Sequence, residues 1–579
     1  MDPILDFVND DASVLISDMS RCRPAEALSD RRRNDRWHLI PYTAEAFDGK
    51  ILGAGTLADV PDVTLPLNAS GWHAVLVGIW NPHYAYDGAF RIKLKLEGDE
   101  AFQPISEPEP PLEWPGRVEF VEVFFTYADL SGRDLVIRKQ SKGRPAHAYV
   151  GYARLVPLAV DEVRRIEQHR AATDTRMMYA LNDGNGLFYL GPTTREDLLE
   201  EVEQYRHSDV RTLVYAASSG DVVGHPSKVA KPWLADAGDG VCSPGHKLLR
   251  DSVHGLLDNG IVALEVLGEH VRAMGVEFHV MFRMAIVGDV APSDLWHAES
   301  GLVRKHPEWR MVDIDGTPVE KASYAYPEVR AYMLSLIREV IEDYEVDGVN
   351  LGFIRGPHFS AYESISVQDF EKEHGIDPRT IDENDVRAQR HRAGYVTALI
   401  REARALTEEV SRKKRRRIEL SATAYRGEAA FNLFFDLDLL AWTGEGLVDR
   451  LFLTEPFDPD FLDACRDANC RVVMAVGAGA DPMEAMSTIA TTALRGHDLP
   501  ADGFWYWDMN GCQTQPAHWH ALRQIGDRAR MQEIVESPPV RRTTPLKTVE
   551  GLDVCHTTNH GADERGYWPP EMLVCYSGG

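Results

Sequence analysis

The chain has 579 residues, of which 44% are hydrophobic and 26% are charged, and its formal net charge at pH 7 is −28. This length predicts two or three domains rather than one core, and the composition is that of a globular protein. The negative charge argues against nucleic acids and anionic membranes as partners, because either would require a basic stripe on the surface. The one basic run, residues 412–417, lies between a predicted helix and a predicted strand and is interpreted as a solvated loop.

No targeting or membrane segment is predicted. The first residues show no basic segment followed by an apolar one, and the chain has no run of about 18 apolar residues. We therefore expect a cytoplasmic protein with no membrane partner. The cysteines show no Cys-x-x-Cys spacing, which favours free thiols, with a pair between Cys555 and Cys575 as the alternative. The seven cysteines are Cys22, Cys242, Cys465, Cys470, Cys512, Cys555 and Cys575.

The first part of the chain predicts a β domain. Residues 1–34 are interpreted as an N-terminal arm, and residues 35–160 hold short apolar or alternating runs separated by turns, which is typical of an antiparallel β-sandwich. The runs cover residues 72–80, 89–96, 117–125, 134–140 and 148–155. Residues 71–80 and 132–138 resemble strands of the accessory sandwiches found beside carbohydrate enzymes. Packing against the next domain is favoured over sugar binding as the role of this sandwich.

A linker helix over 161–173 leads to a repeat of apolar strands and amphipathic helices over 174–530. Eight such alternations predict a (β/α)₈ TIM barrel of the α/β class. A doubly wound open sheet is the alternative, but no Gly-x-Gly-x-x-Gly turn follows the first strand. The predicted strands cover 177–181, 212–217, 277–283, 348–353, 418–423, 450–454, 471–476 and 503–507. Residues 531–579 are predicted either to cap the barrel or to begin a further β unit.

The fourth predicted strand carries the most specific motif. On a strand, Val349, Leu351 and Phe353 share one face, and Asn350 and Gly352 lie on the other. Residues 346–357, Val-Asp-Gly-Val-Asn-Leu-Gly-Phe-Ile-Arg-Gly-Pro, resemble the fourth-strand signature of family-10-like glycosyl hydrolases, Val-Asp-Gly-Ile-His-Leu-Asp-Tyr-Ile-Arg-Tyr-Pro. The resemblance covers roughly residues 174–530 and implies a TIM barrel that acts on glycans. Asn350 replaces the family's histidine, and Gly352 replaces the aspartate that is the family's candidate acid/base group.

Glycoside hydrolysis requires two carboxyl groups on opposite sides of the sugar bond. Glu455 directly follows an apolar strand and precedes Pro456, and Asp508 ends the aromatic strand at 503–507. We therefore predict Glu455 and Asp508 as the catalytic pair, sharing the roles of general acid and of base or nucleophile. Trp505 and Trp507 are predicted to contact the substrate, because aromatic faces stack on pyranose rings.

Further polar residues lie where a barrel keeps its chemistry, at the exits of strands. The substrate-binding candidates among them are Arg283, Asn350, Arg355, His358 and Tyr425. Asp347 precedes its strand and is predicted to stabilise the bottom of the barrel, and Glu419 is predicted to pair with Arg283 or His279. No cofactor and no metal is predicted, since the two closest histidine groupings, at 518–520 and 555–560, do not form a convincing ligand set.

Two functions follow from these observations. The first is a glycoside hydrolase that cleaves a poly- or oligosaccharide at the C-terminal mouth of the barrel. The second is a catalytically inactive barrel that binds glycans, and the glycine at 352 favours it. Two insertions, at 218–252 and after the third strand, follow strands and are predicted to be functional. The second insertion contains His306-Pro-Glu-Trp309, which resembles a motif common in these hydrolases.

Overall fold

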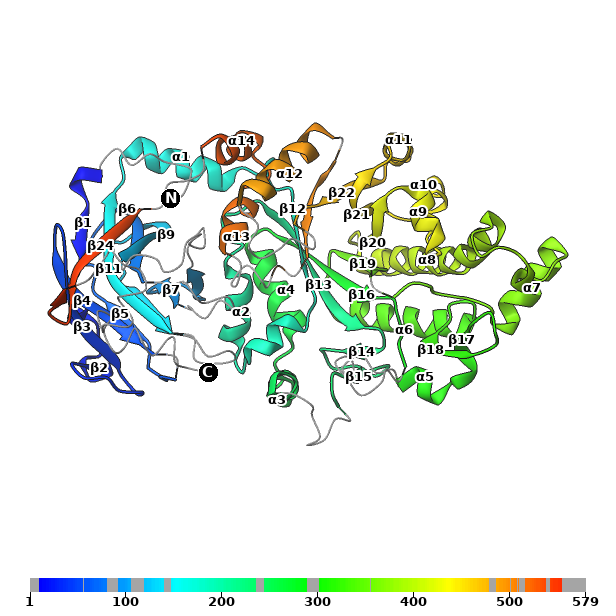
Figure 1. The fold of residues 1–579 in the computed structure, drawn as a ribbon, viewed down its shortest axis with the longest axis horizontal. Helices are drawn as coiled ribbons and strands as arrows, with labels where there is room; N and C mark the ends of the chain where they lie inside the picture. Colours follow the sequence, from blue (N-terminus) through cyan, green and yellow to red (C-terminus); the bar gives the residue numbers. More distant parts are fainter. Residues whose placement is uncertain are drawn as a thin grey trace.

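A computed structural model of the chain places a β domain beside an α/β domain along the long axis of the molecule (Figure 1). The structure describes residues 10–55, 57–80, 92–105, 119–139, 147–235, 244–288, 301–354, 356–477, 486–499, 501–507, 509, 516–537 and 542–553.

The N-terminal domain is a sandwich of two mainly antiparallel sheets, as predicted. Its apolar core, which includes Leu52, Val75 and Leu94, lies between the sheets. The larger sheet contains, in spatial order, β3 (Trp37–Ala44), β4 (Asp48–Ala54), β11 (Ala148–Pro157), β6 (Trp72–Ile79) and β9 (Glu119–Asp129). The smaller sheet contains β5 (Val63–Leu65), β10 (Leu135–Lys139), β7 (Ile92–Leu96) and β8 (Gln103–Ile105).

Both ends of the chain contribute strands to the larger sheet. β1 (Val14–Ile16) pairs with β11, and β2 (Leu28–Ser29) pairs with β3, so the prediction of an arm over 1–34 is wrong for these residues. Near the C-terminus, β24 (Thr543–Val549) pairs with β9 through its first residues and with β3 through its last, and β25 (Leu552–Asp553) follows it. Residues 543–553 therefore complete the N-terminal sheet and do not cap the barrel. The reason is that β3 and β9 otherwise present unpaired edges.

The α/β domain is a closed parallel barrel, which confirms the predicted TIM fold. Its sheet runs in the order β12-β23-β22-β21-β20-β19-β16-β13, and pairing between β12 and β13 closes it. The barrel strands are β12 (Met178–Asn182), β13 (Val210–Ser219), β16 (Glu277–Arg283), β19 (Gly348–Gly352), β20 (Glu419–Gly427), β21 (Arg450–Phe457), β22 (Arg471–Ala475) and β23 (Gly503–Tyr506).

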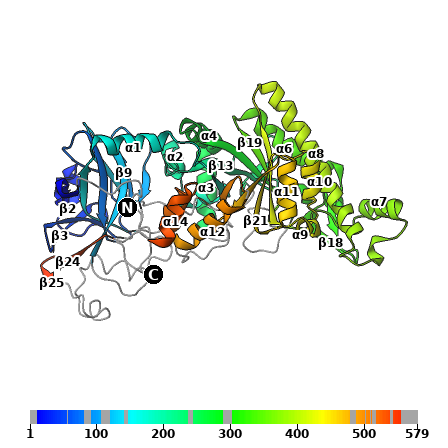
Figure 2. The same cartoon turned by 90° about the horizontal axis from the view of Figure 1, so that it is seen from above.

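Helices surround the barrel, and the view from above shows α6, α8, α10 and α11 along one side of it (Figure 2). The helices are α1 (Val160–Ala171), which links the domains as predicted, α2 (Arg195–Glu203), α3 (Pro244–Asp258), α4 (Ala263–Ala273), α6 (Pro327–Asp343), α7 (Ser364–His374), α8 (Val386–Lys414), α9 (Ala429–Phe434), α10 (Leu439–Gly444), α11 (Pro459–Asp467), α12 (Met486–Asp498), α13 (Pro516–Leu522) and α14 (Arg528–Glu536). The two insertions hold β14 (Val222–Val223), β15 (Lys231–Pro232), α5 (Gly301–Lys305), β17 (Arg310–Val312) and β18 (Pro318–Ala322).

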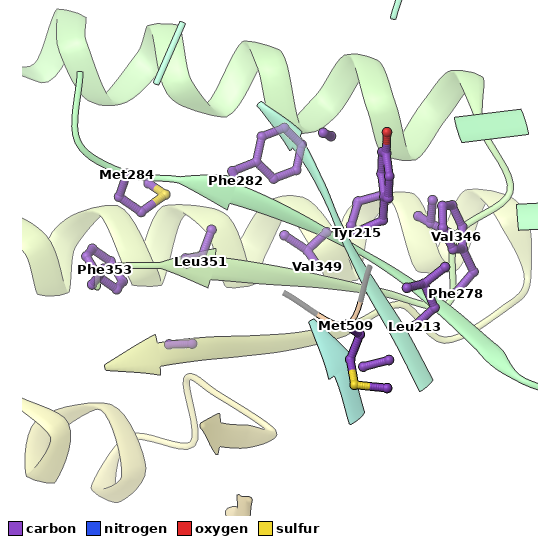
Figure 3. Close-up of a cluster of buried hydrophobic side chains, with 14 of the residues drawn as sticks. Leu213, Tyr215, Phe278, Phe282, Met284, Val346, Val349, Leu351, Phe353 and Met509 are labelled. Carbon is purple, nitrogen blue, oxygen red and sulfur yellow. The ribbon is translucent and has the colours of Figure 1, made fainter. Parts of the chain in front are cut away.

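The alternation of side chains along each barrel strand separates two apolar clusters. Val349 and Leu351 on β19, and Phe353 directly after it, face outward into the cluster shared with the helices, where Phe282 of β16 joins them (Figure 3). The opposite, inward face of the strands supplies a smaller cluster that includes Met281. Both faces are buried, which explains why these strands read as nearly continuous apolar runs.

A layer of charged side chains fills the lower part of the barrel interior. Glu419 forms an ion pair with Arg450, in which Oε2 lies 3.1 Å from Nη2, and it accepts a hydrogen bond from Arg471. Burial acts to raise the pKa of the Glu419 carboxyl, but these two arginines outweigh it and the pKa is lowered. His279 lies in the same layer, where burial lowers its pKa to about 4. The prediction that Glu419 pairs with Arg283 is wrong, because Arg283 ends β16 at the opposite end of the barrel.

Asp347 stabilises the bottom of the barrel, in agreement with its predicted structural role. Its carboxylate accepts from the backbone N–H of Phe278 and from Nη1 of Arg416, each at 2.9 Å. Arg416 belongs to the basic run, so this run is not simply a solvated loop; part of it pairs with acids beneath the barrel.

We expect Asp347→Asn to lower the free energy of unfolding by about 1–3 kcal/mol, because it weakens a charge-assisted hydrogen bond and disturbs the backbone contact. Urea titration measures this change. Asp343→Asn, at an exposed position at the end of α6, is the matched control and should have little effect. Equal stability of the two variants would show that Asp347 contributes nothing particular to the fold.

Candidate functional site

Three side chains meet at the C-terminal mouth of the barrel. Asp183 follows β12, Arg283 ends β16, and Trp507 follows β23. The Arg283 guanidinium donates to the Asp183 carboxylate, and it lies 5.4 Å from the centroid of the Trp507 ring. The Asp183 side chain is 11% exposed and that of Arg283 is 18% exposed, so the pair is largely shielded but reachable. We call Asp183, Arg283 and Trp507 the mouth group.

Strand periodicity directs these three side chains inward. On β12, Tyr179 and Leu181 belong to the interior cluster, and Asp183 continues the same face beyond the strand. On β16, Met281 is interior and Arg283 follows two positions later. Successive side chains on a strand point to opposite faces, so the polar groups stand above an apolar interior.

The indole N–H of Trp507 is a hydrogen-bond donor that the described residues around it leave without an acceptor. Its indole Nε1 is buried and has no hydrogen-bond partner among the described residues. Its ring lies 6.1 Å from that of Trp505. A buried donor without an acceptor costs about 1–3 kcal/mol, so an acceptor on a ligand at this position would be favourable.

Trp505 lies below the mouth and is not available to a substrate. It is 1% exposed, and its Nε1 donates to the carbonyl oxygen of Leu453 at 3.0 Å. The structure therefore does not support the predicted substrate contact for Trp505. Its role is to pack beneath Trp507.

Asn350 also lies in the interior, fully buried. Its amide nitrogen donates to Ser421 Oγ at 3.0 Å, and its amide oxygen accepts from Thr423 Oγ1 at 2.8 Å. These bonds fix β19 against β20. The predicted substrate-binding role of Asn350 is not supported, because these bonds engage both ends of its amide.

The space on the inward face of β19 at Gly352 is closely bounded by the neighbouring strand. A Cβ added at Gly352 would lie 3.1 Å from Sδ and 3.3 Å from Cγ of Met281. The methionine of the neighbouring strand thus takes the space next to the position where the resembling family carries its aspartate. A carboxylate there would require Met281 to move.

A second polar group lies on the loops after β19 and β20. His358 Nδ1 lies 3.2 Å from Asp436 Oδ1, and Arg392 Nε donates to the same oxygen at 2.9 Å. Burial acts to raise the pKa of Asp436, but His358, Arg392 and the N–H of Phe359 outweigh it and the pKa is lowered. The His358 side chain is 34% exposed, so a buried carboxylate orients a reachable imidazole.

Lys321 holds the loop that carries His358. Its ammonium donates to the carbonyl oxygens of Gly356 and His358, and its own burial lowers its pKa to about 8. The lysine therefore contributes a partly buried positive charge and anchors the backbone next to the imidazole.

Tyr425 joins an aromatic cluster beside His358. Its ring lies 4.7 Å from that of Phe435, which in turn lies 6.0 Å from the His358 ring. The Tyr425 hydroxyl is buried and has no hydrogen-bond partner among the described residues, and burial raises its pKa to about 12. The structure thus brings His358 and Tyr425 to one cluster and Arg283 and Trp507 to another.

Glu455, predicted as a catalytic residue, lies on the outer side of its strand. Leu451 and Leu453 on β21 face the surrounding helices, and Glu455 continues that outward face. Its side chain is 39% exposed, and its carboxylate accepts from Arg495 of α12 at 2.9 Å. Counting alternate residues from the apolar run assigns Glu455 to the helix side of the strand. The geometry therefore does not support Glu455 in the barrel mouth. The other predicted catalytic residue, Asp508, and the predicted substrate-binding residue Arg355 lie outside the described residues.

Sequence reasoning missed Asp183 and Asp436. Asp183 could have been found, because it follows the first apolar strand after one residue and shares the inward parity of Tyr179. Asp436 gave no such signal, since it lies in a loop and its partners come from separate elements.

Within the described ranges, no three histidine, cysteine, aspartate or glutamate side chains are grouped so that they could hold a metal ion. In the same residues, no helix has the length and apolar character needed to cross a bilayer. Cys22, Cys465 and Cys470 are buried free thiols.

Residues 246–454 match the model of the family described as Glycosyl hydrolase-like 10, which confirms the resemblance seen in the fourth strand. A comparison with curated proteins gave no match.

Similar solved structures are glycoside hydrolases. They include alpha-L-fucosidase isoenzyme 2 from Paenibacillus thiaminolyticus (14% identity, TM-score 0.39, 62% of this chain and 49% of that one). They also include the beta-galactosidase from the psychrophilic Marinomonas ef1 (11%, 0.40, 62% and 59%) and the PgaB (BpsB) glycoside hydrolase domain from Bordetella bronchiseptica (11%, 0.37, 60% and 98%). The chain thus spans about half the length of the fucosidase.

Proposed function

We propose that this protein is a glycoside hydrolase that binds a poly- or oligosaccharide at the mouth group. The observation that carries the proposal is the juxtaposition of Asp183, Arg283 and Trp507, with an indole N–H that has no partner among the described residues. A sugar ring on Trp507 would bury apolar C–H surface against the indole, and its hydroxyls would reach the carboxylate, the guanidinium and Nε1. The family match over 246–454 supports glycans as the ligand class.

The pairing with Arg283 decides the role of Asp183 in this proposal. The Arg283 guanidinium donates to the Asp183 carboxylate and holds it at the mouth, and we assign Asp183 the role of base, of nucleophile or of a stabiliser of positive charge on the sugar. Hydrolysis needs a second carboxyl group as acid, and we assign that role to Asp508, which directly follows Trp507 in the sequence.

Glycan binding without hydrolysis is the second candidate, and one observation favours it. The inward space beside Gly352, where the resembling family carries a carboxylate, is bounded closely by Met281. A barrel that lost its fourth-strand acid would keep a sugar-binding mouth and lose turnover.

Binding tests the site that both candidates share. Wild type and Trp507→Ala are compared on a panel of soluble polysaccharides by affinity electrophoresis and, for the glycan that binds, by titration calorimetry. We expect Trp507→Ala to weaken binding at least about tenfold, because stacking and the indole hydrogen bond are both lost. Trp519→Ala, on α13 and packed against Tyr205, is the control for loss of an indole elsewhere. Unchanged affinity in Trp507→Ala would contradict the mouth group as the glycan site.

A further inference from the structure

A cavity separate from the mouth group lies between the two insertions and α6. Its volume is about 630 Å³, which is within the range of small-ligand sites. Trp309 and Tyr332 contribute aromatic surface to it. Aliphatic side chains from both insertions form the rest of its apolar lining, namely Val222, Val229, Leu234 and Leu302.

Two features fix the shape of this lining. The His306 ring stacks on the Trp309 indole, with 3.8 Å between the centroids and 13° between the planes. Leu234 is 6% exposed and has a φ of +63°, in the left-handed region that a leucine rarely adopts. The chain thus adopts an unfavourable backbone conformation where this leucine lines the cavity. A flat aromatic pair and an aliphatic wall therefore enclose the same space.

The charged residues of the lining are engaged or balanced. Asp221 is buried and accepts from a backbone N–H of α5 at 2.9 Å. Lys231 and Arg304 have partners within the protein. Lys305 and Glu328 are exposed and opposite in sign. The cavity therefore does not select for a charged ligand.

Hydrogen bonding favours an aromatic ligand over a sugar in this cavity. The Tyr332 hydroxyl already donates to the carbonyl oxygen of Val229 at 3.3 Å. A sugar ring here would exchange hydrogen bonds with water for few new ones, which costs free energy. An aromatic ring has no such bonds to lose, and it gains apolar contact with the aliphatic wall and with the indole of Trp309.

The first insertion connects this cavity to the mouth group. Gly220 follows β13 with a φ of +63°, and its N–H donates to the carbonyl oxygen of Arg283 at 3.2 Å. A Cβ added at Gly220 would lie 2.8 Å from the carbonyl oxygen of Ala285, so the chain passes closely over the end of β16. Asp221, the next residue, lines the cavity, whereas the Arg283 side chain pairs with Asp183. The cavity thus begins one residue from a backbone contact with the mouth group.

We propose that this cavity binds an aryl group that the glycan carries as its aglycone, the non-sugar part of a glycoside. The proposal rests on the proposed function and narrows its substrate class to glycosides with an aromatic aglycone. The sugar stacks on Trp507 at the mouth, and the aryl ring contacts Trp309 and Leu234 in the cavity. Aromatic rings in such contacts prefer offset-stacked or edge-to-face arrangements, and both bury apolar surface.

The test uses β-naphthol as the aryl group alone, together with the β-naphthyl and methyl glycosides of glucose, mannose and xylose. Titration calorimetry measures the affinity of each probe for wild type and for two cavity variants. Trp309→Ala removes the indole. Ala235→Trp adds a large side chain at an exposed residue of the lining, so it fills the cavity without removing a core contact. This second variant decides the question even where Trp309→Ala does not fold.

Two further variants are the controls. Trp519→Ala removes a half-buried indole on α13 that does not line the cavity. Trp507→Ala removes the indole of the mouth group. Both should bind β-naphthol as wild type does.

We expect Trp309→Ala and Ala235→Trp to bind β-naphthol at least about tenfold more weakly than wild type does. Each naphthyl glycoside should bind wild type about tenfold more tightly than its methyl counterpart, and this advantage should disappear in the two cavity variants. Binding of β-naphthol should show a negative change in heat capacity and little dependence on salt, because it buries apolar surface and pairs no charges.

Three results would overturn the proposal. Failure of wild type to bind β-naphthol, or equal affinity of wild type and Ala235→Trp, would exclude the cavity as an aryl site. Weaker binding of β-naphthol by Trp507→Ala would place the ring at the mouth instead. Binding of β-naphthol in the cavity without an advantage for the naphthyl glycosides would exclude the aglycone. The polysaccharide panel with Trp507→Ala tests the mouth group independently, so failure of the proposed function is recognised separately.

Discussion

Asp183→Asn should lower turnover at least about a hundredfold on any glycan that the wild-type protein cleaves, within the usual range for loss of a base or nucleophile. The amide occupies nearly the same volume as the carboxylate and can still contact Arg283, so KM should change much less than kcat. Initial rates of reducing-end release, measured over a range of substrate concentrations, give the two constants separately.

Glu455→Gln is the matched comparison for this prediction, because it also replaces one strand-exit carboxylate by its amide. Its carboxylate faces Arg495 on the helix side of β21, so we expect turnover within about threefold of wild type, the range of a surface ion pair. A large loss in Glu455→Gln with near-normal turnover in Asp183→Asn would reverse the assignment. Normal turnover in both variants would remove both residues from the chemistry.

Most of the barrel could be predicted from the sequence because its strands are buried on both faces. Such strands read as apolar runs separated by amphipathic helices, and eight of these alternations leave few other folds. The sandwich was predicted from its turn spacing for the same local reason. β24 could not be assigned, because its partners β3 and β9 lie at the opposite end of the sequence and a single strand carries no information about its neighbours.

The candidate site was predicted less well, because the face of the strand to which each side chain points also has to be known. Position at the end of a strand is readable from the sequence, and it selected Arg283 and Trp507, which the structure has at the ends of β16 and β23. Whether an end residue faces the interior depends on counting alternate residues from a known inward position. That count places Asp183 inside and Glu455 outside. The contacts of Asp436 with His358 and Arg392 join three separate elements, which no local pattern encodes.

The largest effect on stability is expected at Glu200, which joins the two domains. Its side chain, on α2, is 3% exposed, and it accepts from Lys93 of β7 and from Nη1 of Arg138 of β10, the latter at 2.6 Å. We expect Glu200→Ala to lower the free energy of unfolding by about 3–5 kcal/mol, because Lys93 is left buried at 9% side-chain exposure without its carboxylate partner. Equilibrium unfolding in urea at pH 7, followed by tryptophan fluorescence, measures the loss.

Two comparisons separate the buried charge from a general weakening of the interface. Glu196→Ala removes a neighbouring carboxylate that pairs with Lys95 at 2.9 Å but is 36% exposed, so its cost should stay below about 1 kcal/mol. The double variant Glu200→Ala/Lys93→Met replaces the buried ion pair by apolar groups, and we expect it to recover much of the stability, since the penalty arises from the uncompensated ammonium rather than from lost attraction. Recovery would also show that the ion pair is not required for the sandwich to dock on α2. A loss below about 1 kcal/mol in Glu200→Ala would contradict the argument, because it would mean that water or another carboxylate already solvates Lys93 at this junction.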